Sequence, residues 1–158
     1  MLVPVNISRL LIREMADSQF VTLQEIEGSR SFPIAIGLNE AFAIERRMSG
    51  AVPPRPQTHD LLESVISSMG ATLVRIEIHD LDSGTFHARL ILDQDGRTFA
   101  VDSRPSDALA LGVASDTPIF VEDSVIEEAG HVAPDEIGGT SDSPGFDEDL
   151  DEDDSEFQ

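Results

Sequence analysis

The sequence predicts an α+β domain in which antiparallel or mixed β-sheet strands combine with a few short helices. Three observations support this fold class. Apolar and polar residues alternate near the N-terminus and again in the centre of the chain, as in strands with one buried face. Other segments carry apolar residues at helical spacing. Short turn signals separate all of these segments, which favours a single small domain.

Seven strands are expected from the alternation. Three of them cover residues 3–15, 20–26 and 32–36, and four more cover residues 74–79, 86–92, 98–101 and 119–121. The central strands are joined by the turn Asp82-Ser83-Gly84 and by Asp95-Gly96, which is a strong hairpin signal. The sequence therefore predicts a meander in the middle of the chain.

Four helical segments are expected between and after these strands. Residues 39–48 form the first, where Ala41, Ile44 and Met48 can face the core. Thr58 is a good N-cap for the second, which Gly70 closes. Its apolar stripe consists of Leu61, Leu62, Val65, Ile66 and Met69. Residues 105–113 form a third, with Pro105 at the favourable first position, and residues 124–129 a short fourth.

Composition divides the 158-residue chain into a domain at residues 1–130 and an acidic tail at residues 131–158. The tail holds 11 of the 31 acidic residues and no arginine or lysine, so we expect it to be disordered. The absence of cysteine excludes disulfides and thiolate metal sites. Neither a signal peptide nor a membrane-spanning stretch is apparent, so we expect a cytoplasmic protein without membrane contact.

The formal net charge is −21, and all ten basic residues are arginines. Two explanations compete for this acidic, lysine-free composition: adaptation to a salt-rich cytoplasm, where salt screens self-repulsion, or genomic base composition. In either case the net field repels nucleic acid at low salt. A polyanionic substrate therefore needs a local cluster of arginines.

The turn at residues 102–108 is the first candidate for chemistry. Asp102 and Asp107 are spaced so that their oxygens could hold a divalent ion such as Mg²⁺ or Mn²⁺, and Arg104 could clamp a phosphate. A structural role is the alternative, because Asp107 complements the helix dipole and Arg104 can pair with Asp102. Ser106 adds a hydroxyl to the same turn.

A second polar turn, residues 55–60, opens the helix that follows it, and both turns could line one groove. His59 could act as a general acid or base near neutral pH, and Arg55 could bind an anion. In the structural alternative Thr58 caps the helix and Asp60 complements its dipole. Glu40, in the first turn of the expected helix at residues 39–48, could likewise have either a functional role or a structural role at the helix dipole. No glycine-rich phosphate loop, zinc-protease helix motif or serine elbow is present.

Three segments together resemble the bifunctional nuclease domain family over residues 3–129. They are residues 32–37 with Glu40, residues 55–62, and residues 102–111 followed by Pro118-Ile119. The resemblance implies an α+β fold, a wedge-shaped dimer with a large groove, and DNase and RNase activity. The positions that match the family motifs are Glu40, Arg55, Thr58, His59, Asp60, Asp102, Arg104, Ser106 and Asp107.

The sequence is thus interpreted as a nuclease of low sequence specificity acting on DNA and RNA, assisted by a divalent cation and without an organic cofactor. His59, Asp60, Asp102 and Asp107 are its expected catalytic residues. Arg55, Thr58, Arg104 and Ser106 are expected to bind substrate, and Asp102, Asp107 and Glu40 to bind Mg²⁺ or Mn²⁺. The alternative is a non-enzymatic homodimer that binds an anionic ligand or a partner protein in the same groove.

Overall fold

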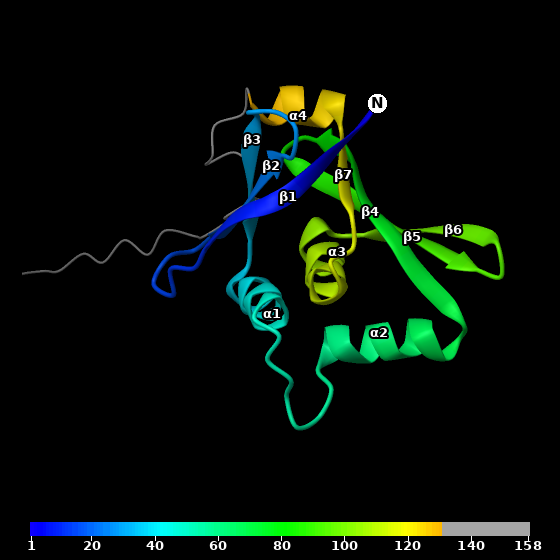
Figure 1. Cartoon of the computed structure of the whole chain (residues 1–158). Coiled ribbons are helices and arrows are strands. Elements are labelled where there is room, and N and C mark those ends of the chain that lie inside the picture. Colours follow the sequence, from blue (N-terminus) through cyan, green and yellow to red (C-terminus); the bar gives the residue numbers. More distant parts are fainter. Residues whose placement is uncertain (131–158) are drawn as a thin grey trace, which may run out of the picture.

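The computed structural model describes residues 1–130, which form a seven-stranded sheet with four α-helices (Figure 1). The strands are β1 (Leu2–Leu11), β2 (Gln19–Glu25), β3 (Ser31–Ile36), β4 (Ala71–Asp82), β5 (Thr85–Gln94), β6 (Arg97–Ser103) and β7 (Ile119–Glu122). The helices are α1 (Leu38–Met48), α2 (Thr58–Ser68), α3 (Pro105–Gly112) and α4 (Asp123–Ala129), with a 3₁₀ turn at Val113–Ser115. This confirms the α+β class. The predicted acidic tail lies outside the described residues.

The sheet consists of two antiparallel meanders joined by the last strand. Its order is β3-β2-β1-β7-β4-β5-β6. Strand β7 runs antiparallel to β1, with Val3 opposite Val121, and parallel to β4, with Ile78 opposite Val121. The β4–β5 turn at Ser83-Gly84 and the β5–β6 turn at Asp95-Gly96 have positive φ at both central residues, as the hairpin signals predict. The sheet is therefore mixed.

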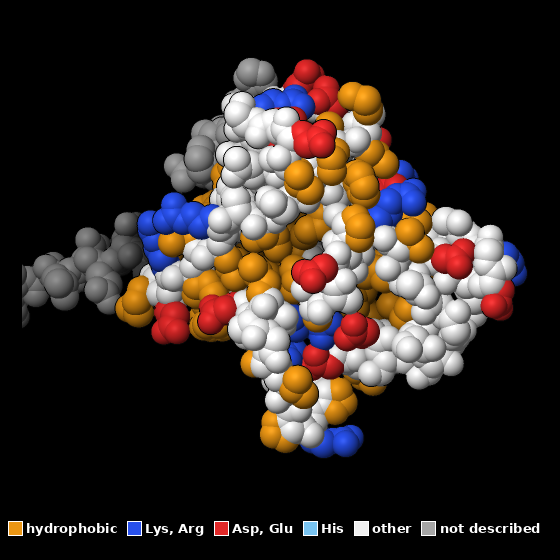
Figure 2. All heavy atoms as spheres, viewed as in Figure 1, with side chains coloured by type: hydrophobic (Ala, Val, Ile, Leu, Met, Phe, Trp, Pro, Cys, Tyr) orange, Lys and Arg blue, Asp and Glu red, His pale blue; other side chains and the backbone are white. Residues whose placement is uncertain are grey.

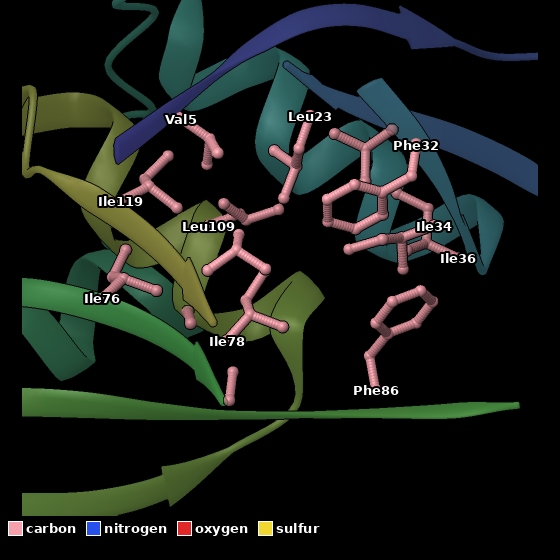
Figure 3. Close-up of a cluster of buried hydrophobic side chains, with 14 of the residues drawn as sticks. Val5, Leu23, Phe32, Ile34, Ile36, Ile76, Ile78, Phe86, Leu109 and Ile119 are labelled. Carbon is pink, nitrogen blue, oxygen red and sulfur yellow. The ribbon is translucent and has the colours of Figure 1, made fainter. Parts of the chain in front are cut away.

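The core lies on one face of this sheet, under α1, α3 and α4 (Figure 3). Phe32 on β3 and Phe86 on β5 stack with their ring centroids 5.6 Å apart, although four strands separate β3 from β5 in the sheet. Such a contact requires the sheet to curve strongly toward the helices. Leu109 on α3 is fully buried inside this curve.

Helix α2 differs from the other helices because none of its residues is buried. Its predicted apolar stripe is present, but Leu61, Leu62, Val65 and Met69 are between 38% and 65% exposed. Only Ile66 packs against the core. In Figure 1 this helix lies at the lower end of the molecule, away from most of the sheet. No helix within residues 1–130 is long and apolar enough to cross a bilayer.

The structure corrects two local expectations, in β1 and in α1. The first strand ends at Leu11 rather than at residue 15, because Gln19 bonds to the carbonyls of Arg13 and Ala16 and holds a turn there. Met48 is exposed. The arginine before it, Arg47, is buried instead, since the neighbouring helices supply acceptors for its guanidinium.

Helix α2 begins differently from the prediction. Gln57 is its N-cap, and Thr58 is the first helical residue. The side chain of Asp60 accepts a hydrogen bond from the backbone N–H of Gln57 at 2.9 Å, while the Gln57 side chain accepts one from the backbone of Asp60. This reciprocal capping box replaces the expected threonine cap.

Candidate functional site at three helix N-termini

The structure brings the two polar turns together. The ring Nε2 of His59, at the start of α2, lies 3.0 Å from Oδ1 of Asp107, in the first turn of α3. The two residues are 48 positions apart in the chain. The His59 side chain is only 14% exposed, so this hydrogen bond is largely shielded from competing water.

Arg104 extends this pair to a third helix. Its Nε donates to Oδ2 of Asp107 at 2.8 Å, and its Nη1 donates to Oε1 of Glu40, in the first turn of α1, at 3.3 Å. The N-termini of α1, α2 and α3 therefore converge on Glu40, His59, Arg104 and Asp107, which we call the His59 site. Helix N-termini carry partial positive charge and unpaired N–H groups, so this arrangement favours anions.

Electrostatics keep Asp107 ionised. Burial raises the pKa of its carboxyl group, but hydrogen bonds from Arg104 and His59 outweigh this effect and hold the pKa below its ordinary value. The same contact raises the pKa of Arg104. An ionised carboxylate can only accept hydrogen bonds, so Asp107 fixes His59 with its proton on Nε2. In the neutral imidazole, the Nδ1 of His59 is then the nitrogen that carries the lone pair.

A cavity of about 210 Å³ adjoins the Arg104 side of the site. Its lining includes Gly37, Glu40, Arg104 and the buried Ser106. A Cβ at Gly37 would lie 2.2 Å from Oε2 of Glu40, so a larger residue would displace this flexible carboxylate from its present position beside Arg104.

Asp60 is held in a separate group of ion pairs. Its carboxylate accepts hydrogen bonds from Arg46 Nη2 at 2.9 Å and from Arg47 Nη1. Arg47 also donates to Glu63 Oε2 at 3.0 Å. We call Arg46, Arg47, Asp60 and Glu63 the Asp60 cluster; Figure 2 shows arginine and acidic side chains next to one another between α1 and α2. Burial raises the pKa of Asp60, but hydrogen bonds from the N–H of Gln57 and from the two arginines outweigh this effect. The pKa of Asp60 is therefore below its ordinary value.

The Asp60 cluster connects the three helices of the site. Arg47 lies on α1 and is only 5% exposed. Its Nε donates to the carbonyl of Ala110 in α3 at 2.6 Å, and its Nη2 to that of Leu111 at 3.2 Å. Because Asp60 follows His59 directly, these contacts set the position of the His59 ring relative to Asp107. Asp60 therefore has a positioning role here, and nothing in its contacts directs it toward a substrate.

The remaining expected residues lie apart from this arrangement. Asp102 is exposed on β6, opposite Arg89 of β5, and Arg104 pairs with Asp107 rather than with Asp102. Arg55 and Thr58 are exposed at the entrance of α2. Within residues 1–130, no three His, Cys, Asp or Glu side chains are grouped so that they could hold a metal ion. Glu40, Asp102 and Asp107 therefore do not fit a three-ligand metal site.

Sequence reasoning missed two buried charged residues, Arg47 and Glu77. Arg47 lies three positions after the core residue Ile44, on the apolar side of α1, which is an unusual place for an arginine. Glu77 is flanked by the core residues Ile76 and Ile78 and is only 2% exposed. The alternation of β4 correctly places Glu77 on the opposite face, but alternation gives no measure of how deeply a residue on that face is covered.

The fold and the site define a small α+β protein with a polar site at three converging helix N-termini. The sequence matches the Bifunctional nuclease domain over residues 21–134, and the chain belongs to this family. Two curated relatives from Mycobacterium tuberculosis, of strains CDC 1551 / Oshkosh and ATCC 25618 / H37Rv, are both described as uncharacterized proteins. Each is 39% identical to this chain over 132 residues, which cover 84% of this chain and 79% of the relative.

Proposed function

We propose that this protein hydrolyses phosphodiester bonds in DNA and RNA with low sequence specificity, at the His59 site. The observation that carries the proposal is the shielded 3.0 Å contact between His59 and Asp107 beside Arg104. A histidine oriented by an ionised carboxylate is a common general base, and an adjacent guanidinium suits a phosphate. Membership of a nuclease-domain family supports the same activity class.

Each side chain has a defined task in this proposal. Nδ1 of His59 takes a proton from the attacking water as its oxygen bonds to phosphorus, and the imidazolium returns a proton to the leaving oxygen as the P–O bond breaks. Asp107 holds the ring and stabilises its positive charge. Arg104 is 64% exposed and uses Nε and one Nη1 hydrogen for Asp107 and Glu40, so further N–H groups can bind the phosphate.

The surrounding residues complete the proposed binding region. Arg55 lies exposed at the entrance of α2, where it can attract a polyanion, and Thr58 follows at the first helical position. Ser106 lines the 210 Å³ cavity beside Arg104. No step is drawn through a divalent cation, because the carboxylates do not form a three-ligand group. Assistance by Mg²⁺ or Mn²⁺ stays part of the proposal, and metal titration tests it.

A homodimer in the cytoplasm is also part of the proposal. The exposed apolar residues of α2 support it, since contiguous apolar surface of this kind marks interaction sites. In Leu62→Glu, Val65→Glu we expect a monomer, while the native chain sediments as a dimer. Sedimentation of both proteins as monomers contradicts the dimer and leaves the His59 site unaffected.

The test is cleavage of labelled single-stranded DNA and RNA by the full chain, with Mg²⁺, Mn²⁺ or EDTA and across a range of salt. We expect His59→Ala and Asp107→Asn to lose about 10²–10⁴-fold in rate, as is typical for general acid–base residues. The matched control is His79→Ala, which removes a histidine on β4 that is not the one hydrogen-bonded to Asp107. Circular dichroism checks that all variants remain folded.

Equal cleavage by all variants contradicts the proposed site. Absence of cleavage by the native chain under every condition contradicts the activity and favours the alternative, a non-enzymatic module that binds an anionic ligand at the same residues. Inorganic phosphate titrated against thermal unfolding separates these cases, because a binding module is stabilised by the ligand without turnover.

A further inference from the structure

The outer face of the sheet, opposite the core, carries a second arrangement of arginines. Glu77 on β4 lies on this face, with Arg89 of β5 and Phe120 of β7 beside it in register. Its Oε1 accepts a hydrogen bond from Nε of Arg75 at 2.7 Å, and its Oε2 accepts one from Nε of Arg89 at 2.6 Å. We call Arg75, Glu77 and Arg89 the Glu77 cluster.

The two arginines of the Glu77 cluster use only part of their hydrogen-bonding capacity. Each donates to Glu77 through Nε, and within residues 1–130 neither has another hydrogen bond from its Nη atoms. Their side chains are 37% and 39% exposed, whereas that of Glu77 is 2% exposed. The buried carboxylate therefore holds both guanidinium groups in place while their outer N–H groups face solvent.

Stability alone does not account for a carboxylate in this position. Burial raises the pKa of Glu77, but the hydrogen bonds from Arg89 and Arg75 lower it below its ordinary value, so the group is charged. Buried ion pairs of this kind commonly give no more stability than apolar residues of the same volume. Guanidinium groups that are held in place and keep free N–H donors suit the binding of phosphate groups.

The charge balance of the Glu77 cluster is unusual for this protein. Its hydrogen-bonded members are two arginines and one carboxylate and are thus formally positive, while the exposed Asp102 lies opposite Arg89 on the neighbouring strand. Other arginine–carboxylate groups in residues 1–130 are neutral or negative: the Asp60 cluster has two charges of each sign, and Arg30 and Arg104 each contact two carboxylates. In a chain with a net charge of −21, a polyanion needs such a local excess of arginine.

We propose that the Glu77 cluster binds the phosphodiester backbone of a nucleic acid whose neighbouring segment occupies the His59 site. This inference rests on the proposed function. Continuity along β6 supports it: Asp102 lies opposite Arg89, and Arg104 follows two residues later, about 7 Å further along an extended chain. A strand can therefore pass over the edge strand β6 from one region to the other.

The test measures binding apart from cleavage. Labelled single-stranded phosphorothioate DNA is titrated with the full chain in EDTA, and anisotropy is recorded at several salt concentrations. The variant Arg75→Gln, Arg89→Gln is expected to bind about 10-fold more weakly at low salt and to reduce the salt slope by about 1.4, since each phosphate contact on a single strand contributes about 0.7. The matched control is Arg9→Gln, Arg13→Gln, which removes two exposed arginines from the β1 region.

A variant that is expected to strengthen binding, rather than weaken it, makes the test more specific. Asp102 is exposed opposite Arg89 and repels a phosphate there, so Asp102→Asn is expected to strengthen binding about 3-fold. Equal weakening in both double-arginine variants overturns the inference, because the effect is then one of net charge. Absence of binding by the native chain overturns it as well. Urea unfolding establishes that the variants are folded.

Failure of the inference and failure of the proposed function give different results. Cleavage that requires His59, with binding unaffected by Arg75→Gln, Arg89→Gln, overturns only the Glu77 cluster as a binding surface. Binding that depends on Arg75 and Arg89, without cleavage in any metal or salt, supports this surface and contradicts the hydrolytic activity.

Discussion

Asp60 and Glu77 are each shared by two arginines, yet the two clusters are built in opposite ways. In the Asp60 cluster the buried member is a cation, Arg47, whose guanidinium bonds to two carboxylates and two backbone carbonyls. In the Glu77 cluster the buried member is the anion, and the arginines are exposed. Burying the cation uses its donors within the protein, while burying the anion leaves donors available at the surface.

This difference separates structural ion pairs from ion pairs that can bind a ligand. The Asp60 cluster joins α1, α2 and α3. Because His59 directly precedes Asp60, the cluster also determines where His59 lies. The Glu77 cluster joins only neighbouring strands, which the sheet already holds together. Loss of the Asp60 cluster is therefore expected to affect stability and the His59 site. Loss of the Glu77 cluster is expected to affect nucleic-acid binding.

The largest expected effect comes from Arg47→Met. It leaves Asp60, Glu63 and two carbonyls without their shared donor, and breaking one side of a buried ion pair typically costs about 3–5 kcal/mol. Urea unfolding measures the loss. Arg89→Met is the matched comparison, with an expected cost of about 1–3 kcal/mol because Arg89 donates to Glu77 alone, which keeps Arg75, whereas Arg47 donates to four acceptors. Equal losses in the two variants would mean that the clusters do not differ as described.

Acid pH is expected to weaken both clusters. The pKa values of Asp60, Glu77 and Asp107 are lower in the folded protein than their ordinary values of 3.8 to 4.5. Below those values the unfolded chain binds more protons than the folded chain. The contribution of these carboxylates to the free energy of unfolding is therefore constant above about pH 5 and falls as the pH decreases through 4.5.

Variants identify which carboxylates cause this loss of stability at acid pH. Asp60→Asn and Glu77→Gln should each flatten the fall in stability between about pH 5 and pH 2, because the protonation difference is removed. The matched control is Glu127→Gln, an exposed residue on α4. A fall in stability that begins above pH 6 would contradict the involvement of these carboxylates.

A smaller effect on stability is expected when the whole Glu77 cluster is replaced. The triple variant Arg75→Met, Glu77→Leu, Arg89→Met should remain within about 1 kcal/mol of the native chain, since apolar residues of similar volume replace a buried ion pair at little cost. It should also lose the nucleic-acid binding described above. A loss of several kcal/mol would show that the cluster is structural, as the Asp60 cluster is.

The smallest effect concerns salt. The coupling energy between Arg89 and Glu77 in a double-mutant cycle is expected to decrease by a few tenths of a kcal/mol between about 0.1 M and 1 M NaCl, because the exposed guanidinium is accessible to counterions. The coupling between Arg47 and Glu63 involves a deeply buried cation and should change less. The reverse order would contradict the burial of the two arginines.

Much of the fold follows from local patterns in the sequence. Alternation located seven strands, and the turns at Ser83-Gly84 and Asp95-Gly96 fixed the central meander, because two consecutive positive φ values demand small or Asx-type residues. Pro105 likewise marked the start of α3. The two polar turns of the candidate site were recognisable because each combines several charged and hydroxyl side chains at a helix entrance.

Which of those residues meet was decided only by the tertiary structure. The pairing of β7 with both β1 and β4, and the curvature that stacks Phe32 on Phe86, place α3 where Asp107 reaches His59. No local pattern encodes this contact across 48 residues. The sequence alone determined which segments are strands and helices, since each depends on neighbours along the chain. Partners of Asp60, Glu77 and Asp107 depend on burial and long-range packing, which exist only once the chain has folded.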